Sequence, residues 1–168
     1  MNQKIIIQDN FFDKDIFKKI QAEVLTLDFT IKSSVNTMQK GYHNVKLNSG
    51  SFLEREVIKK IKTHFNISSI KKIDSFYLLS FPSTPEIAHN DDAYDWNCLI
   101  NIVGEPLTNN GLGFYIDSPT PNEKILNSLI GFKENRCIFF DSKIWHSPLH
   151  FAGGSSPRYA LANFINVK

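Results

Sequence analysis

The sequence is poor in cysteine, in long apolar runs and in net charge, and each shortage excludes a class of protein. Only two cysteines occur among 168 residues, which excludes a disulfide-stapled scaffold. No apolar run approaches the ~20 residues that a membrane-spanning helix needs. The 19 basic and 17 acidic residues leave a formal charge of +2, so no strong field favours nucleic acid or an anionic membrane as a partner.

Several short functional motifs are missing as well. Residues 1–10 lack a cationic segment followed by an apolar one, so no export signal is visible and we expect a cytoplasmic protein. The sequence has no glycine-rich phosphate loop, no Cys/His zinc spacing and no Ser or Cys nucleophile elbow. It does have 42% hydrophobic residues, including 14 Phe, and these are enough to fill the core of one domain over residues 1–168.

Hydrophobic periodicity divides this domain into a helical layer over residues 1–67 and a β core over residues 68–168. A strand is predicted at residues 5–7, and Asp13 is the expected cap of a helix that continues to Leu27. Ser51 and Glu54 form a capping-box pattern at the start of a second helix. The predicted strands of the β core are Ile70–Phe81, Trp96–Val103, Gly113–Ile116, Ile125–Phe132, Arg136–Phe140, Lys143–His146 and Arg158–Asn166.

This order of elements favours an α+β, mainly β domain with two N-terminal helices packed on one sheet of a β-sandwich or jelly roll. Helix–strand alternation is missing, which disfavours a doubly wound sheet. The polar segment Ser33–Asn48 joins the two helices and is longer than the common connection of about 2–8 residues. We predict that part of it covers the mouth of the functional site. A passive surface excursion is the alternative.

The most informative motif is His89-Asn90-Asp91. Residues two apart on an extended strand project from one face, so the imidazole and the carboxylate converge. With a second imidazole, such a pair completes the two-histidine, one-carboxylate set of non-haem Fe(II) oxygenases, which leaves three metal positions open. Taken alone, the motif is equally typical of a polar loop that leads into a strand.

Two later residues extend this set. His146 lies 55 residues after Asp91, and Arg158 lies 12 residues further on, at the start of an apolar segment. A buried guanidinium is costly unless it pairs with an anion. Its planar fork suits a carboxylate.

With these residues in this order, the chain resembles the Fe(II)- and 2-oxoglutarate-dependent dioxygenases, and within them the small prolyl-hydroxylase-like group. The resemblance spans nearly the whole chain, because it also includes residues 5–12 and the segment 111–115. It implies a double-stranded β-helix core, Fe(II) held by His89, Asp91 and His146, and 2-oxoglutarate anchored by Arg158. It also implies hydroxylation of a small-molecule or peptidyl substrate, with release of succinate and CO2.

The chain departs from that family at two places. Many relatives have adjacent glycines where this chain has Gly111-Leu112-Gly113, and the segment Leu99–Ile102 lacks a tyrosine that is often present. Asn101 is a candidate substitute partner for 2-oxoglutarate, and a position facing solvent is its alternative. Tyr77 is a further candidate, with an ordinary half-buried strand tyrosine as the alternative.

Other assignments stay open at this point. His150 is the reserve distal ligand, although Pro148 disfavours a face shared with His146. A cupin-like metal enzyme that does not use 2-oxoglutarate is one alternative function, and a catalytically silent jelly-roll binding module is another. Nucleic acid is not expected as a partner, because no basic stripe alternates with aromatic residues. The sequence does not identify the primary substrate or the oligomeric state.

Overall fold

The computed structural model describes residues 4–29, 43–81, 87–107, 110–150 and 156–168. These residues include two helices, α1 (Lys14–Val24) and α2 (Phe52–Phe65). The strands are β1 (Ile5–Gln8), β2 (His43–Lys46), β3 (Ile70–Ser80), β4 (Trp96–Val103), β5 (Asn110–Asp117), β6 (Lys124–Gly131), β7 (Cys137–Asp141), β8 (Trp145–His150) and β9 (Arg158–Val167). The prediction of a mainly β domain with two N-terminal helices is confirmed.

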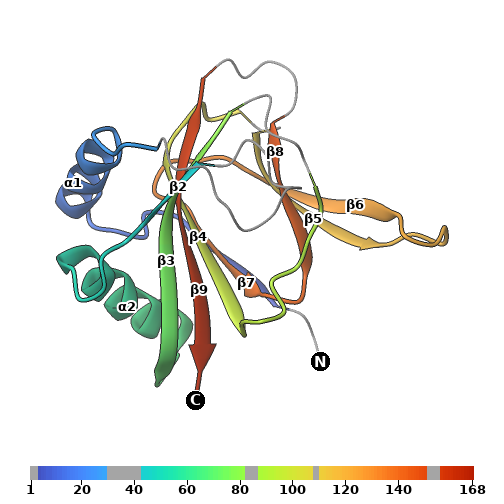
Figure 1. Ribbon diagram of the computed structural model, residues 1–168, viewed down its shortest axis with the longest axis horizontal. Coiled ribbons are helices and arrows are strands. Elements are labelled where there is room, and N and C mark those ends of the chain that lie inside the picture. The colour runs from blue at the N-terminus through green and yellow to red at the C-terminus, as the bar shows by residue number, and fades with distance from the viewer. Residues whose placement is uncertain (1–3, 30–42, 82–86, 108–109, 151–155) are drawn as a thin grey trace.

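The strands form two antiparallel sheets. The larger has the order β1-β7-β4-β9-β3-β2, and the smaller has the order β6-β5-β8. Figure 1 shows the helices on one side of the larger sheet and the smaller sheet on its other side. Strands β1 and β2, which come from the first part of the chain, therefore extend the larger sheet at both of its edges.

The two helices begin in different ways. At α2, the Ser51 hydroxyl accepts a hydrogen bond from the N–H of Glu54 at 3.2 Å, as the capping-box pattern predicts. The Glu54 carboxylate returns to the N–H of Gly50 rather than to that of Ser51. At α1, Asp13 occupies the cap position but makes no side-chain cap bond. Its carboxylate instead accepts a hydrogen bond from Lys60 of α2, which links the two helices.

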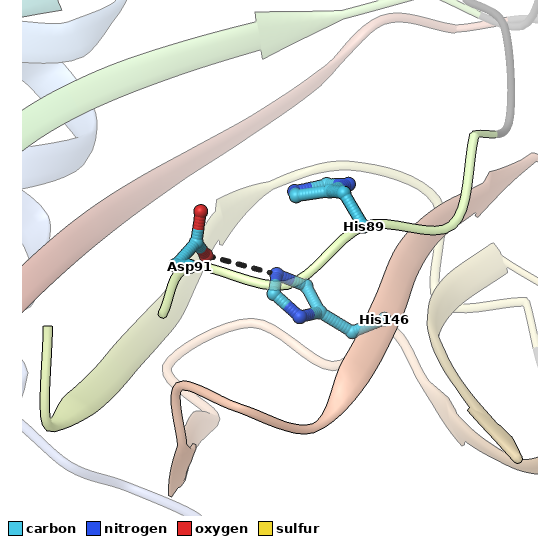
Figure 2. Close-up of side chains that lie close together, drawn as sticks. All are labelled: His89, Asp91 and His146. Atoms are coloured by element: carbon cyan, nitrogen blue, oxygen red, sulfur yellow. Dashed lines mark ion pairs between the residues drawn. The ribbon is translucent and has the colours of Figure 1, made fainter. Parts of the chain in front are cut away.

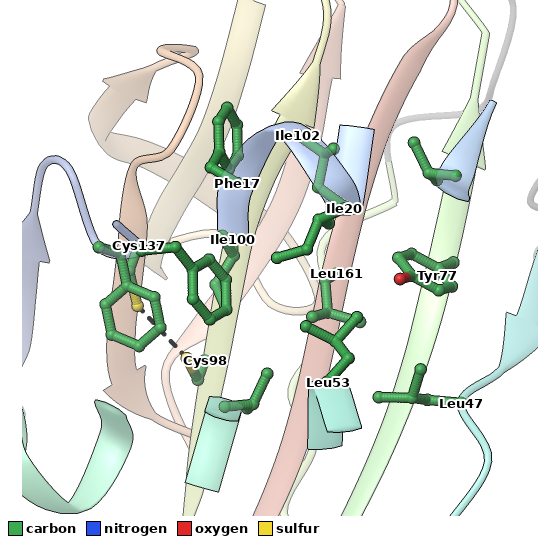
Figure 3. Packing of buried hydrophobic residues seen from close by; sticks show 14 of the residues in the cluster. Phe17, Ile20, Leu47, Leu53, Tyr77, Cys98, Ile100, Ile102, Cys137 and Leu161 are labelled. Carbon is green, nitrogen blue, oxygen red and sulfur yellow. Dashed lines mark hydrogen bonds between the residues drawn. The ribbon is translucent and has the colours of Figure 1, made fainter. Parts of the chain in front are cut away.

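Strand β4 divides the interior into two apolar regions, because its side chains alternate between two faces. Cys98, Ile100 and Ile102 face the helices, where they join a helix-facing cluster with residues such as Ile20 and Leu161 (Figure 3). The other face of β4 carries Asn97, Leu99 and Asn101. Leu99 there packs against a second cluster, whose buried residues are Leu112, Phe114, Ile138, Phe140 and Ile144. This inter-sheet cluster joins the larger sheet to β5 of the smaller one.

The segment between the helices is described only in part. Residues 43–46 form β2, which pairs with β3 in antiparallel register. Residues 30–42 lie outside the described residues, so the predicted cover over the site stays a prediction. Neither described helix is both long and apolar enough to cross a membrane.

Candidate metal centre

His89, Asp91 and His146 come together at one edge of the smaller sheet (Figure 2). One nitrogen from each imidazole and one carboxylate oxygen all lie within 4.8 Å of one another. His146 comes from β8, whereas His89 and Asp91 come from the segment that precedes β4. The structure thus brings together the three residues that the sequence suggested as metal ligands.

Backbone hydrogen bonds hold the two ligand-bearing segments side by side. The N–H of His89 donates to the carbonyl of His146 at 2.9 Å, and the N–H of His146 donates to the carbonyl of His89 at 2.8 Å. The N–H of Asp91 donates to the carbonyl of Ser142, also at 2.9 Å. These backbone hydrogen bonds therefore set where each ligand-bearing residue lies relative to the other two.

Local hydrogen bonds also decide which ring nitrogens are available. Nδ1 of His89 lies 3.0 Å from the carbonyl oxygen of Ile87, and Nδ1 of His146 lies 2.9 Å from that of Ile144. A carbonyl oxygen can only accept, so each Nδ1 carries the hydrogen and each neutral ring keeps a lone pair on Nε2. Nε2 of His146 lies 3.2 Å from Oδ2 of Asp91. Two atoms with lone pairs at that distance need a proton or a cation between them, so this donor set fits a bound cation.

Electrostatics favours the ligand forms of His89 and Asp91. Burial lowers the pKa of His89, and the neighbouring His146 lowers it further. Burial alone would raise the pKa of Asp91, but its contacts with His146 and His89 and the hydrogen bond from Asn97 hold it below its ordinary value. Neutral imidazole and ionised carboxylate are the forms that bind metal ions.

Two neighbouring side chains contact the candidate ligands. The ring of Phe140 meets the ring of His146 edge-on, with centroids 4.8 Å apart. Nδ2 of Asn97 donates a hydrogen bond to Oδ2 of Asp91 at 2.6 Å. Sequence reasoning missed Asn97, although a polar residue inside the apolar segment Trp96–Val103 was a signal.

Arg158 begins β9 and is buried, with 5% of its surface exposed. Its Nη1 donates to Oδ1 of Asn110 at 3.1 Å and to the carbonyls of Gly111 at 2.8 Å and Leu149 at 3.3 Å. The guanidinium therefore reaches from the larger sheet to β5 and β8 of the smaller one. A β-carbon on Gly104 would lie 2.9 Å from Cζ of Phe132 and 3.2 Å from Cγ of Arg158, so the absence of a side chain there leaves room for both residues.

The other sequence candidates are placed differently. Asn101 is buried on the same face of β4 as Asn97, and its Nδ2 has no hydrogen-bond partner among the described residues. Tyr77 belongs to the helix-facing cluster, where burial raises its pKa, so it is not brought near the candidate metal ligands. His150 lies at the far end of β8, opposite Asn110. Among the described side chains, His146 is the later histidine that joins the group.

No protein-family model matches the sequence, and a comparison with curated proteins finds no match. Solved structures do match. A prolyl-4-hydroxylase of Pseudomonas putida is 11% identical, with a TM-score of 0.64 and coverage of 99% of this chain and 94% of that one. HygX of Streptomyces hygroscopicus, with nickel, 2-oxoglutarate and hygromycin B bound, is 9% identical with a TM-score of 0.70, covering 99% and 84%.

A third match is a prolyl hydroxylase of Trichoplax adhaerens in complex with a peptide fragment of hypoxia inducible factor. It is 13% identical, with a TM-score of 0.67 and coverage of 97% of this chain and 83% of that one. The chain therefore has the fold of these two prolyl hydroxylases and of HygX.

Proposed function

We propose that this protein is an Fe(II)- and 2-oxoglutarate-dependent oxygenase that hydroxylates a small molecule or a peptidyl side chain. The observation that carries the proposal is the donor set of His89, Asp91 and His146, gathered within 4.8 Å with both Nε2 lone pairs available. Two imidazoles and one carboxylate form the ligand set of non-haem Fe(II) oxygenases. The fold shared with a structure that holds nickel and 2-oxoglutarate supports the choice of cosubstrate.

The sheet topology supports a double-stranded β-helix core. The bridge between His89 and His146 adds a fourth strand-like segment to the smaller sheet, next to β8. The smaller sheet then has the order residue 89, β8, β5, β6, and it faces the central strands β7, β4, β9 and β3 of the larger sheet. In this arrangement the metal ligands project between two four-stranded layers.

Arg158 and Asn101 are the residues we assign to 2-oxoglutarate. Arg158 would bind the distal carboxylate, because its guanidinium is buried between the sheets and offers a planar fork. Asn101 would donate its unpartnered Nδ2. Its cross-strand neighbour is Ala160, and that of Leu99 is Ala162, so the side chains that follow Arg158 on this face of β9 are small.

The bound groups would supply oxidative chemistry, in which dioxygen and 2-oxoglutarate are converted to succinate and CO2 as the substrate is hydroxylated. The chain's own residues would bind these groups and orient the metal ligands. The carbonyls of Ile87 and Ile144 fix the two ring orientations, and Phe140 covers one side of the His146 ring. For the primary substrate, the matching structures hold a peptide fragment in one case and hygromycin B in another, so a peptidyl or a small-molecule substrate is proposed.

Calorimetric titrations without oxygen test this proposal. Fe(II) should bind to the wild type, and 2-oxoglutarate should bind only after the metal. The variant Asp91→Ala should bind neither, and its unfolding temperature in the metal-free form serves as the control for folding. Metal binding without 2-oxoglutarate binding would instead support a cupin-like metal enzyme, and a wild type that binds no metal would support a silent binding module.

A further inference from the structure

Asn97 is a polar side chain in an apolar place. It is 4% exposed, and its direct cross-strand neighbours are Phe140 on β7 and Phe164 on β9. A primary amide buried between two phenylalanines costs free energy unless its polar atoms find partners. The described residues offer a partner to its Nδ2 but none to its Oδ1. A residue that mainly stabilised the fold at this position would be apolar.

The partner of Asn97 is the carboxylate of the candidate metal centre. Nδ2 of Asn97 donates to Oδ2 of Asp91 at 2.6 Å, and the same oxygen lies 3.2 Å from Nε2 of His146. Asn97 belongs to β4, which pairs on both sides within the larger sheet, so its position is fixed by two ladders. Asp91 belongs to a segment outside the named strands. The hydrogen bond therefore ties a ligand on a segment outside the named strands to a strand that pairs on both sides.

We infer that Asn97 is a positioning residue that turns the Asp91 carboxylate toward the two imidazoles before a cation binds. A carboxylate on a free side chain samples several rotamers, and ordering it on metal binding would lower the affinity. The amide removes that cost by selecting one rotamer. Loss of such a hydrogen bond to a ligand lowers metal affinity by about 10- to 100-fold. The inference rests on the proposed metal-binding function and adds a residue to it.

The test compares three variants with the wild type. Asn97→Leu keeps the approximate size of the side chain and removes the donor, and Asn97→Ser is a milder change that disturbs packing less. Asn101→Leu is the matched control for metal binding, because Asn101 lies on the same face of the same strand, is equally buried, and its Nδ2 donates to none of the described residues. Binding of Co(II) alone is measured by equilibrium dialysis, without 2-oxoglutarate.

We expect the Kd for Co(II) to rise 10- to 100-fold in Asn97→Leu and to stay within about threefold of the wild type in Asn101→Leu. The visible absorption spectrum of bound Co(II) should also change in the Asn97 variant alone, since it reports how the carboxylate coordinates. If Asn97 only stabilised the fold, Asn97→Leu would lower the unfolding temperature and leave both the Kd for Co(II) and the absorption spectrum unchanged.

The outcomes distinguish failure of the inference about Asn97 from failure of the proposed function. If the wild type binds Co(II) and Asn97→Leu binds it equally well, or if both asparagine variants weaken it alike, the inference about Asn97 is wrong and the proposed function stands. If the wild type binds neither Co(II) nor Fe(II), the proposed function itself fails. Should Asn97→Leu not fold, the same Kd thresholds apply to Asn97→Ser.

Discussion

Replacing Arg158 with lysine separates binding of 2-oxoglutarate from binding of the metal. Nη1 of Arg158 contacts three oxygens that belong to β5 and β8, and these contacts orient the guanidinium fork. Lysine keeps the charge but has one nitrogen, which cannot hold the same oxygens and also donate twice to a carboxylate. At least one charge-assisted hydrogen bond is therefore lost, worth about 1.5–3 kcal/mol.

That loss corresponds to a Kd for 2-oxoglutarate that is about 10- to 150-fold higher, since 1.4 kcal/mol is a factor of ten. Calorimetry on the Mn(II)-loaded protein without oxygen measures it, and a separate Mn(II) titration gives the metal affinity, which should not change. A 2-oxoglutarate Kd within threefold of the wild type would refute the reasoning. So would a parallel loss of Mn(II) affinity, because Arg158 would then act on the centre as a whole.

Three further outcomes are expected. His146→Ala should abolish Co(II) binding in equilibrium dialysis, whereas His150→Ala should retain it. The opposite result would make His150 the distal ligand. Gly111→Ala should cost about 1–3 kcal/mol in urea unfolding, because the new β-carbon would overlap a carbonyl oxygen of β6; an unchanged midpoint would contradict this. The Arg136 hydrogen bond lowers the pKa of Asp9 from 3.8 to about 2, so its stabilisation is complete above pH 4 and is lost as the pH falls toward 2. After allowance for solvent screening it amounts to about 1 kcal/mol, so Asp9→Asn should flatten the stability profile between these pH values, and an identical slope would falsify the assignment.

The strand pattern was predictable because aromatic and β-branched segments alternate with turn residues over the β core. Every predicted strand there has a counterpart, and β4 has the same bounds as predicted, Trp96–Val103. Helix caps were less predictable. Asp13 has the right residue type for a cap, but a lysine on the other helix competes for its carboxylate.

The candidate site was predictable to the extent that it depends on spacing. His89 and Asp91 are two residues apart, so their convergence follows from strand geometry. The surroundings of Tyr77 and Asn97 could not be predicted in this way. Alternation divides a strand into two faces, but the sequence does not say which face meets the helices. Sheet register decides this, and it places Tyr77 in the helix-facing cluster and Asn97 beside the Asp91 carboxylate.

The reciprocal pair of backbone hydrogen bonds between His89 and His146 has a consequence for assembly of the fold. The orientation of each ring is encoded within three residues, but the proximity of the rings depends on how two edge segments align. A slip of one residue along β8 would point Trp145 inward and His146 outward. A cation that binds only the correct alignment would favour it by about 2.7 kcal/mol at a concentration of 100 Kd. The bound metal would then stabilise the correct alignment of the two segments at the edge of the sheet.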